Sequence, residues 1–260
     1  MNVFIFTDLE GISGVTDIDF MDKNDPKYAL ACELLCKSIN SAVCACMDAG
    51  AERVYYIDGH AGGGNVNEDM IDKRAIKCSL SEWQKLTVGK EIDCLIELGS
   101  HARAGTMGGF LDHTMNSKQW FCHRVNGVEM SELSLHALVC GAYGIPTVAC
   151  IGDEMACEQA KEYVPDIYCG AVKKATCRNF AENYDNAEEI LINTVKAAIK
   201  GYKNVSLYKI DGSATVSLTF YRTDMCERVL ARCGDEVRRV DARTLCKTVD
   251  TIRKYEDLKF

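Results

Sequence analysis

Residues 1–14 read MNVFIFTDLEGISG, an apolar run from Val3 to Phe6 that ends at once in two carboxylates, Asp8 and Glu10. An uninterrupted apolar run is typical of a strand buried on both faces of a parallel sheet. Two carboxylates directly after such a strand suit either a solvated turn or a metal site. The rest of the chain has to decide between these two interpretations.

Short apolar runs alternate with longer helical patterns along the whole chain. This alternation predicts an α/β fold with a largely parallel sheet flanked by helices. The predicted strands cover residues 3–7, 53–58, 93–98, 147–152, 167–172 and 214–220. The predicted helices cover residues 26–50, 132–144, 154–163, 187–202, 223–233 and 243–255.

Turn residues between 203 and 213 predict a boundary between two parts of the chain. Residues 1–202 would form the metal-binding, catalytic α/β lobe, and residues 203–260 a smaller C-terminal α/β portion packed on it. The second part contains no histidine, so we expect all histidine chemistry in the first.

The overall composition excludes several kinds of partner. The 260 residues carry a formal net charge of -8 without a basic cluster, which argues against nucleic acid and anionic membranes as partners. No apolar run approaches the roughly 18 residues of a membrane span, and no secretory signal is visible, so we expect a cytoplasmic protein. Most of the fifteen cysteines lie in apolar patterns without zinc-site spacing, which indicates reduced core thiols.

Side chains able to bind a metal follow three of the predicted strands at the point where each strand ends. Asp8 and Glu10 follow the first, Asp58 and His60 the second, and His101 the third. Because the carboxyl ends of parallel strands meet at one edge of a sheet, we expect these residues to converge. The predicted metal site therefore lies at the C-terminal ends of the strands.

Each of these residues also has an explanation that involves no metal. The Asp8–Glu10 pair suits a turn, and a loop histidine is commonly a structural hydrogen-bonding group. Glu132 directly follows a predicted helix N-cap and could simply complement the helix dipole. Taken together, however, carboxylates and imidazoles form a mixed O/N donor set suited to zinc or manganese. The spacing leaves open whether one metal is bound or two about 4 Å apart.

Several stretches resemble the motifs of a known family, the zinc-dependent D-aminopeptidases of peptidase family M55, first described as dipeptide transport proteins. They are TDLEGISG, DGHAGGGN, GSHARAGT, DHTM and NGVEMSELSLHA, in order from residue 1 to about 180. The resemblance implies two zinc ions per subunit. It places their ligands on five residues, with the first bridging both ions: Asp8, Glu10, His60, His101 and Glu132.

The resemblance also implies a catalytic histidine at His113, in the stretch GGFLDHTM. The segment from His101 to His113 is one residue longer than in the family pattern, so His123 is the alternative. We expect this histidine to stabilise the oxyanion or protonate the leaving amine, because a dinuclear centre already supplies the nucleophile.

Three further features have weaker functional interpretations. The glycine-rich residues 61–65 lack the Lys-Ser/Thr of a phosphate loop and are expected to give the chain after His60 room to bend. Arg103 suits a structural ion pair better than contact with a substrate carboxylate. Asp58 is expected either to form a turn with Gly59 or to orient His60.

The implied function is a dinuclear zinc aminopeptidase that acts on small peptides, or amides, with an N-terminal D-residue such as D-Ala. The family further implies a ring-shaped homodecamer. Two alternatives remain open at this point: a dinuclear hydrolase with another small-amide or L-peptide specificity, and a non-catalytic cytoplasmic peptide-binding protein.

Overall fold

The larger of two sheets has seven strands in the order β3-β2-β1-β4-β7-β8-β9, as seen in a computed structural model that describes residues 1–260. All neighbouring strands run parallel except β8 and β9, so the predicted largely parallel sheet is confirmed. Its strands are β1 (Asn2–Thr7), β2 (Arg53–Asp58), β3 (Ala75–Lys77), β4 (Cys94–Ser100), β7 (Thr147–Asp153), β8 (Tyr168–Cys177) and β9 (Phe180–Asn183).

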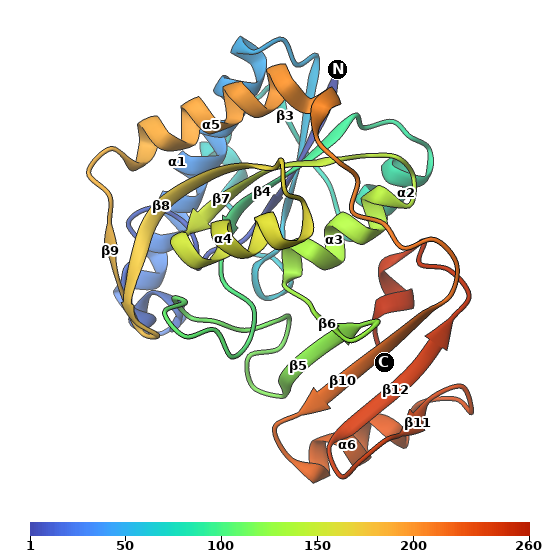
Figure 1. The fold of residues 1–260 in the computed structure, drawn as a ribbon. Coiled ribbons are helices and arrows are strands. Elements are labelled where there is room, and N and C mark those ends of the chain that lie inside the picture. The colour runs from blue at the N-terminus through green and yellow to red at the C-terminus, as the bar shows by residue number, and fades with distance from the viewer.

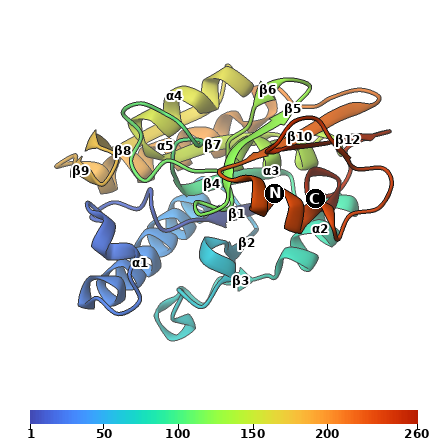
Figure 2. The same ribbon diagram turned by 90° about the horizontal axis from the view of Figure 1, so that it is seen from below.

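Helices cover both faces of this sheet (Figure 1). Helices α1 (Pro26–Asp48) and α5 (Ala187–Gly201) pack together, and α3 (Glu132–Gly141) packs with α4 (Glu154–Tyr163). Figure 2 shows α1 and α4 on opposite sides of the strands. With both faces covered, the central strand β1 buries Val3, Phe4 and Ile5 completely, which explains its uninterrupted apolar sequence.

The second sheet is antiparallel, with the order β11-β12-β10-β5-β6. It contains β5 (Trp120–Val125), β6 (Val128–Glu129), β10 (Ala214–Phe220), β11 (Arg238–Arg239) and β12 (Thr244–Val249). The strand predicted at 214–220 therefore exists but belongs to this sheet. The hairpin of β5 and β6 was missed, although Asn126 and Gly127, with φ of 50° and 82°, form a strong hairpin signal.

The predicted division at residue 203 does not separate the two sheets. Strand β5, from the first part of the chain, pairs with β10 from the second. The reason is that the edge of β10 needs hydrogen-bonding partners, and the hairpin at residues 120–129 supplies them. The C-terminal portion is thus joined to the middle of the chain through one continuous sheet.

The helix predicted at residues 243–255 is wrong. Residues Thr244–Val249 form strand β12, which pairs antiparallel with β10, and a short 3-10 helix follows at Tyr255–Leu258. Leu245 and Val249 have helical spacing, but Thr244, Thr248 and Val249 are β-branched. Pairing with the open edge of β10 decided the conformation, because tertiary contacts override a local periodicity this short.

The other predicted helices are confirmed, with ends that differ by at most three residues. They end in the structure at Asp48, Gly141, Tyr163, Gly201 and, for α6 (Thr223–Leu230), Leu230. Helix α2 (Leu80–Val88) was not predicted; Ser79 caps it in a capping box with Glu82.

One helix meets the length and composition criteria of a membrane span, although no apolar run of that length was predicted. It is α1, and half of its most apolar 18-residue window is buried inside the molecule, where the helix packs on α5, β2 and β4. A core helix of an α/β fold meets the same criteria.

Ten of the fifteen free thiols are also buried, as predicted for cysteines used as core residues.

Candidate metal centre

The three strands that carry the predicted metal ligands are neighbours in the sheet. Strand β1 lies between β2 and β4, so the residues that follow these strands emerge side by side. The strands that follow β1 first extend the sheet on one side, as β2 and β3, and then on the other, as β4, β7 and β8. This reversal makes the end of β1 the switch point where parallel sheets bind ligands. The expected convergence of Asp8, His60 and His101 is therefore observed.

Glycines allow the chain after β1 to lie directly against the end of β4. A Cβ atom on Gly11 would lie 2.2 Å from the Ser100 carbonyl oxygen, and one on Gly99 would lie 2.1 Å from that of Asp8. The close approach is fixed by two backbone hydrogen bonds of 2.8 Å, from Asp8 N to Leu98 O and from Gly11 N to Gly99 O. Glycine is thus required at these two positions.

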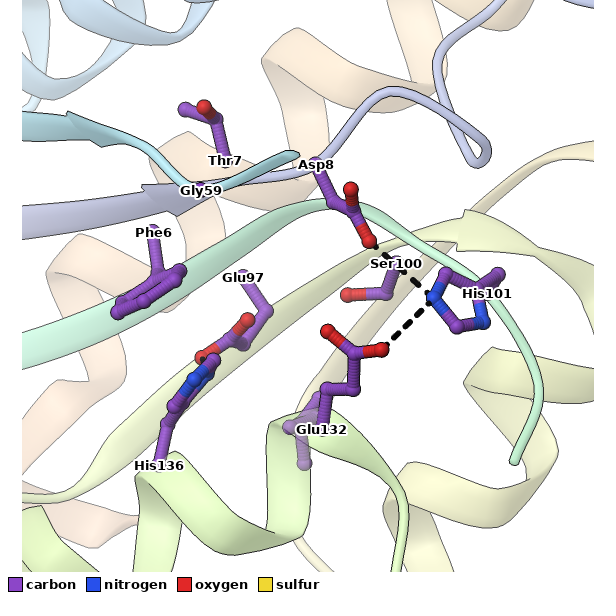
Figure 3. A pocket seen from close by; sticks show the side chains of 10 residues that line it. Phe6, Thr7, Asp8, Gly59, Glu97, Ser100, His101, Glu132 and His136 are labelled. Carbon is purple, nitrogen blue, oxygen red and sulfur yellow. Dashed lines mark hydrogen bonds and ion pairs between the residues drawn. The ribbon is translucent and has the colours of Figure 1, made fainter. Parts of the chain in front are cut away.

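Five side chains meet at this edge, and we call them the strand-end cluster: Asp8, Glu10, His60, His101 and Glu132. His60 Nδ1 lies 3.1 Å from Asp8 Oδ1 and 2.9 Å from Glu10 Oε2. His101 Nε2 lies 3.2 Å from Asp8 Oδ2 and 3.3 Å from Glu132 Oε1. Figure 3 shows Asp8 and Glu132 pointing toward His101 from different elements. Asp8 is therefore central, since each of its oxygens faces a different imidazole.

The hydrogen bond on the far side of His101 fixes its tautomer. Nδ1 lies 3.0 Å from the Ala102 carbonyl oxygen, which can only accept, so Nδ1 carries the proton. In the neutral ring Nε2 then holds a lone pair, and it is buried without a well-directed hydrogen bond. The carboxylates of Asp8 and Glu132 raise the pKa of His101 well above its usual value, so Nε2 faces them either with a proton or with a metal ion on this nitrogen. The donors present therefore fit a metal ion.

The charges of the cluster lead to the same conclusion. Burial alone would raise the pKa of Asp8, but the imidazoles of His101 and His60 hold that pKa well below its usual range. Burial lowers the pKa of His60, yet Glu10 and Asp8 outweigh it and raise this pKa to about 11. The carboxylates thus stabilise positive charge strongly.

Glu132 is presented by the N-terminus of α3. Ser131 caps this helix by accepting a hydrogen bond from Ser134 N, and Glu132 Oε1 accepts one of 2.7 Å from Met115 N. Burial opposes its ionisation, but His101 lowers the pKa of Glu132 to about 2. Glu132 also lies in the first turn of α3, where its charge complements the helix dipole. The same position therefore serves the helix and places the carboxylate in the cluster.

His113 lies beside the cluster, and His123 does not. The ring of His113 stacks on that of His101 with centroids 4.0 Å apart, and its Nε2 lies 3.6 Å from Glu132 Oε1. His123 is buried in β5, where its Nε2 donates to the Leu258 carbonyl at 2.8 Å. Of the two histidines considered from the sequence, His113 therefore lies beside the cluster and His123 lies in the second sheet.

A cleft of about 550 Å³ opens onto the cluster. Its walls include Asp8, Glu10, His60, His113 and Glu132. A ligand in this cleft could reach both the cluster and the His113 ring. Carboxylates and imidazoles that could hold a metal thus line one cleft together with His113, an arrangement suited to a hydrolytic site.

The remaining sequence predictions concern loops around the cluster. Asp58 accepts hydrogen bonds from Asn65 N and Val66 N, at 2.7 and 3.1 Å, so it holds the loop after His60 and does not orient the imidazole ring. Gly62, Gly63 and Gly64 all have positive φ, which confirms the bend expected there. Arg103 pairs with Glu162 at 2.8 Å, which confirms a structural ion pair.

Sequence reasoning missed a second buried pair, Glu97 and His136. His136 Nδ1 lies 3.0 Å from Glu97 Oε1, and both side chains are buried. Together with residues of the cluster they line a cavity of about 20 Å³, room for one water (Figure 3). The available signal was a carboxylate inside an otherwise apolar strand and a histidine four residues after Glu132.

Lys173 was also missed, although it is fully buried beneath the loop that follows β1. Its Nζ donates to the Glu10 carbonyl oxygen at 2.7 Å and to the Val15 carbonyl oxygen. Burial lowers its pKa to about 7. The lysine ties the backbone of the Asp8–Glu10 segment to β8 and so positions the cluster.

A parallel α/β sheet with carboxylates and imidazoles gathered at its switch point defines the class of metal-dependent hydrolases. Comparison with known proteins specifies the family. A family model described as D-aminopeptidase, peptidase family M55, matches residues 1–258. The chain therefore belongs to the M55 peptidases and is an enzyme of the metallo-aminopeptidase class.

Two relatives agree with this assignment. A D-aminopeptidase from Bacillus subtilis (strain 168) is 26% identical over 264 residues, covering 98% of this chain and 94% of the relative. The solved structure of the Zn-dependent D-aminopeptidase DppA from Bacillus subtilis, described as a self-compartmentalizing protease, superimposes with a TM-score of 0.89. That comparison covers 99% of this chain and 95% of the other at 21% identity, so it establishes the fold.

Proposed function

We propose that this enzyme is a dinuclear zinc aminopeptidase that hydrolyses short peptides with an N-terminal D-residue such as D-Ala. The observation that carries the proposal is the division of the cluster into two donor groups around Asp8. Asp8, Glu10 and His60 form one group; His101 and Glu132 form the other, with His113 beside them. The names of the two relatives support zinc as the metal and D-residues as the specificity.

The residues that would hold the metals follow from these distances. Asp8, Glu10 and His60 would bind one zinc ion, and His101 and Glu132, with the second oxygen of Asp8, would bind the other. Zinc bound there would polarise the scissile carbonyl and lower the pKa of the attacking water. Asp8 would contribute to both sites because its two oxygens face in different directions.

His113 would act at its Nε2 atom. Its Nδ1 lies 2.9 Å from the Leu111 carbonyl oxygen and donates to it, so Nε2 is the atom left to exchange protons. From the wall of the cleft, Nε2 would donate to the developing oxyanion or protonate the leaving amine. We propose this role and not that of a nucleophile, since zinc bound at the cluster would supply an activated water.

The native assembly is part of the same proposal. The self-compartmentalizing relative supports a homo-oligomer, and the family resemblance suggests a decamer. We further propose a cytoplasmic location, which suits a chain whose fifteen cysteines are all free thiols. Size-exclusion chromatography with light scattering tests the assembly, and a monomer at micromolar concentration would contradict it.

A substrate panel tests the activity. Zinc-loaded protein is assayed with D-Ala-D-Ala, L-Ala-L-Ala and D-Ala amide, and we expect release of D-Ala from the first at the highest kcat/KM. Preference for the L-peptide would replace the proposal by a dinuclear hydrolase of different specificity. Hydrolysis of none of the three, with zinc bound, would contradict the enzymatic proposal and favour a peptide-binding role.

A further inference from the structure

A second cavity, of about 450 Å³, lies next to the cleft on the other side of Glu132. The two spaces share Gly59, Gly62, Met115 and Glu132 as lining residues. A substrate whose scissile bond lies at the cluster could therefore extend a group into this cavity. Tyr255 and Lys259, close to the C-terminus of the chain, form part of its far wall.

The cavity contains one lysine ammonium that forms no ion pair. Two lysines line it, and Lys77 is paired with Glu68 at 2.7 Å. Lys259 has no carboxylate oxygen within 4.0 Å, and its ammonium lies 3.9 Å from the centroid of the Tyr255 ring. Partial burial lowers the pKa of Lys259, and the charge of Glu256 offsets this effect only in part. The Tyr255 ring holds the ammonium at the cavity wall.

The backbone of three glycines, Gly62, Gly63 and Gly64, forms another part of the cavity wall. A Cβ atom on Gly62 or Gly64 would meet no atom within 4 Å, so these glycines border open space. The N–H of Gly64 donates to no acceptor in the protein, whereas those of Asn65 and Val66 are engaged by Asp58. The cavity thus combines an ammonium that forms no ion pair with open glycine backbone, and the ammonium suits an oxygen anion.

We propose that this cavity is a substrate subsite in which Lys259 binds a carboxylate of the peptide. The inference rests on the proposed function. The carboxylate has two possible sources, the C-terminus of a dipeptide and an acidic side chain on the N-terminal D-residue. Both offer the same anionic group at a short distance from the scissile bond, and the substrates used in the test distinguish them.

Steady-state kinetics with zinc-loaded protein identify the source. D-Ala-D-Ala carries the C-terminal carboxylate, D-Glu amide carries the side-chain carboxylate, and D-Ala amide carries neither. Lys259→Met should raise KM for one of the first two by about ten-fold or more, the loss expected for a charged hydrogen bond. It should leave D-Ala amide unchanged. Lys259→Arg should restore most of the loss, and Lys77→Met, in the same cavity but already paired, should cause none.

A binding measurement separates this inference from the proposed function. Titration calorimetry of D-Ala-D-Ala and D-Glu amide into metal-free protein needs no turnover, and Lys259→Met should weaken one of them by a similar factor. Equal affinities in wild type and variant, or no binding of either ligand to the wild type, would overturn the subsite. Unchanged KM values together with normal hydrolysis of D-Ala amide would also overturn it while leaving the aminopeptidase proposal intact.

Discussion

Two regions of this protein shift the pKa of a histidine in opposite directions. At the end of the parallel sheet, His60 lies between Asp8 and Glu10, which raise its pKa to about 11 despite burial. In the antiparallel sheet, His123 is more completely enclosed and has only the Leu258 carbonyl as a partner, and burial lowers its pKa to about 4. The difference shows that neighbouring carboxylates, more than burial, decide whether a buried imidazole attracts positive charge.

The Glu97–His136 pair lies between these two extremes. Burial raises the pKa of Glu97, and the single imidazole of His136 works against that shift. This pair offers a single carboxylate, and one imidazole already contacts it. The strand-end cluster has three carboxylates, and Asp8 is shared between two imidazoles. Only the cluster therefore has an excess of negative charge that metal ions can neutralise.

The largest expected effect is that of Asp8→Ala. If Asp8 contributes to both metal sites, the variant should lose both zinc ions and about four orders of magnitude in kcat/KM, because metal catalysis supplies several kcal/mol. Glu10→Ala should lose one ion only. Metal analysis after gel filtration measures this, with Asp19→Ala, an exposed carboxylate paired with Lys27, as the control. Near-stoichiometric zinc in Asp8→Ala would contradict the bridging role.

His113→Ala should keep both metals and lose about a thousand-fold in kcat, the typical contribution of a positioned proton donor. His123→Gln should retain wild-type turnover, since His123 lies in the second sheet. Parallel assays of the two variants, with zinc content measured in each, compare the two histidines directly. Unchanged turnover in His113→Ala would remove this residue from the mechanism.

Glu97→Ala should lower the free energy of unfolding by about 4 kcal/mol, since it leaves His136 buried without its partner. Glu97→Gln keeps an oxygen that accepts from His136 Nδ1 and should cost about 1 kcal/mol. Urea unfolding of the metal-free proteins measures both. Similar losses for Ala and Gln would show that the carboxylate charge, and not the hydrogen bond, stabilises this pair.

The smallest effect concerns the pH dependence of His123. Its folded pKa of about 4 lies below the unfolded value near 6.5, so the unfolded state binds the proton first as the pH falls. The stability associated with neutral His123 is complete above pH 6.5 and declines by up to about 3 kcal/mol as the pH approaches 4. Urea unfolding of wild type and His123→Gln at several pH values isolates this contribution, which should be missing from the variant. Parallel pH profiles would contradict a neutral buried imidazole.

The sequence predicted the parallel sheet well because its signals are local. The apolar run Val3–Phe6 and its counterparts in β2, β4 and β7 can be recognised without knowing their neighbours. The carboxylates and histidines that follow them were predicted to converge, and they do. Their roles as metal ligands, and that of His113 in catalysis, stay predictions that the variants above test.

The second sheet was predicted poorly because its strands are defined by pairing partners far away in the chain. Strand β12 carries apolar residues at a spacing that also fits a helix, and only the edge of β10 selects the extended form. The Asn126–Gly127 turn was readable, but the partner of its hairpin lies about ninety residues later. Non-local pairing of this kind leaves little trace in a local pattern.

The sequence by itself determined which donor atoms are available and that they follow the strands of one sheet, because strand periodicity and residue type are properties of short segments. Only the tertiary structure decided that Asp8 directs one oxygen to His60 and the other to His101. It alone revealed Glu97, His136 and the unpaired ammonium of Lys259. The physical reason is that charge balance depends on which side chains are enclosed together, and packing brings together residues that are distant in the sequence.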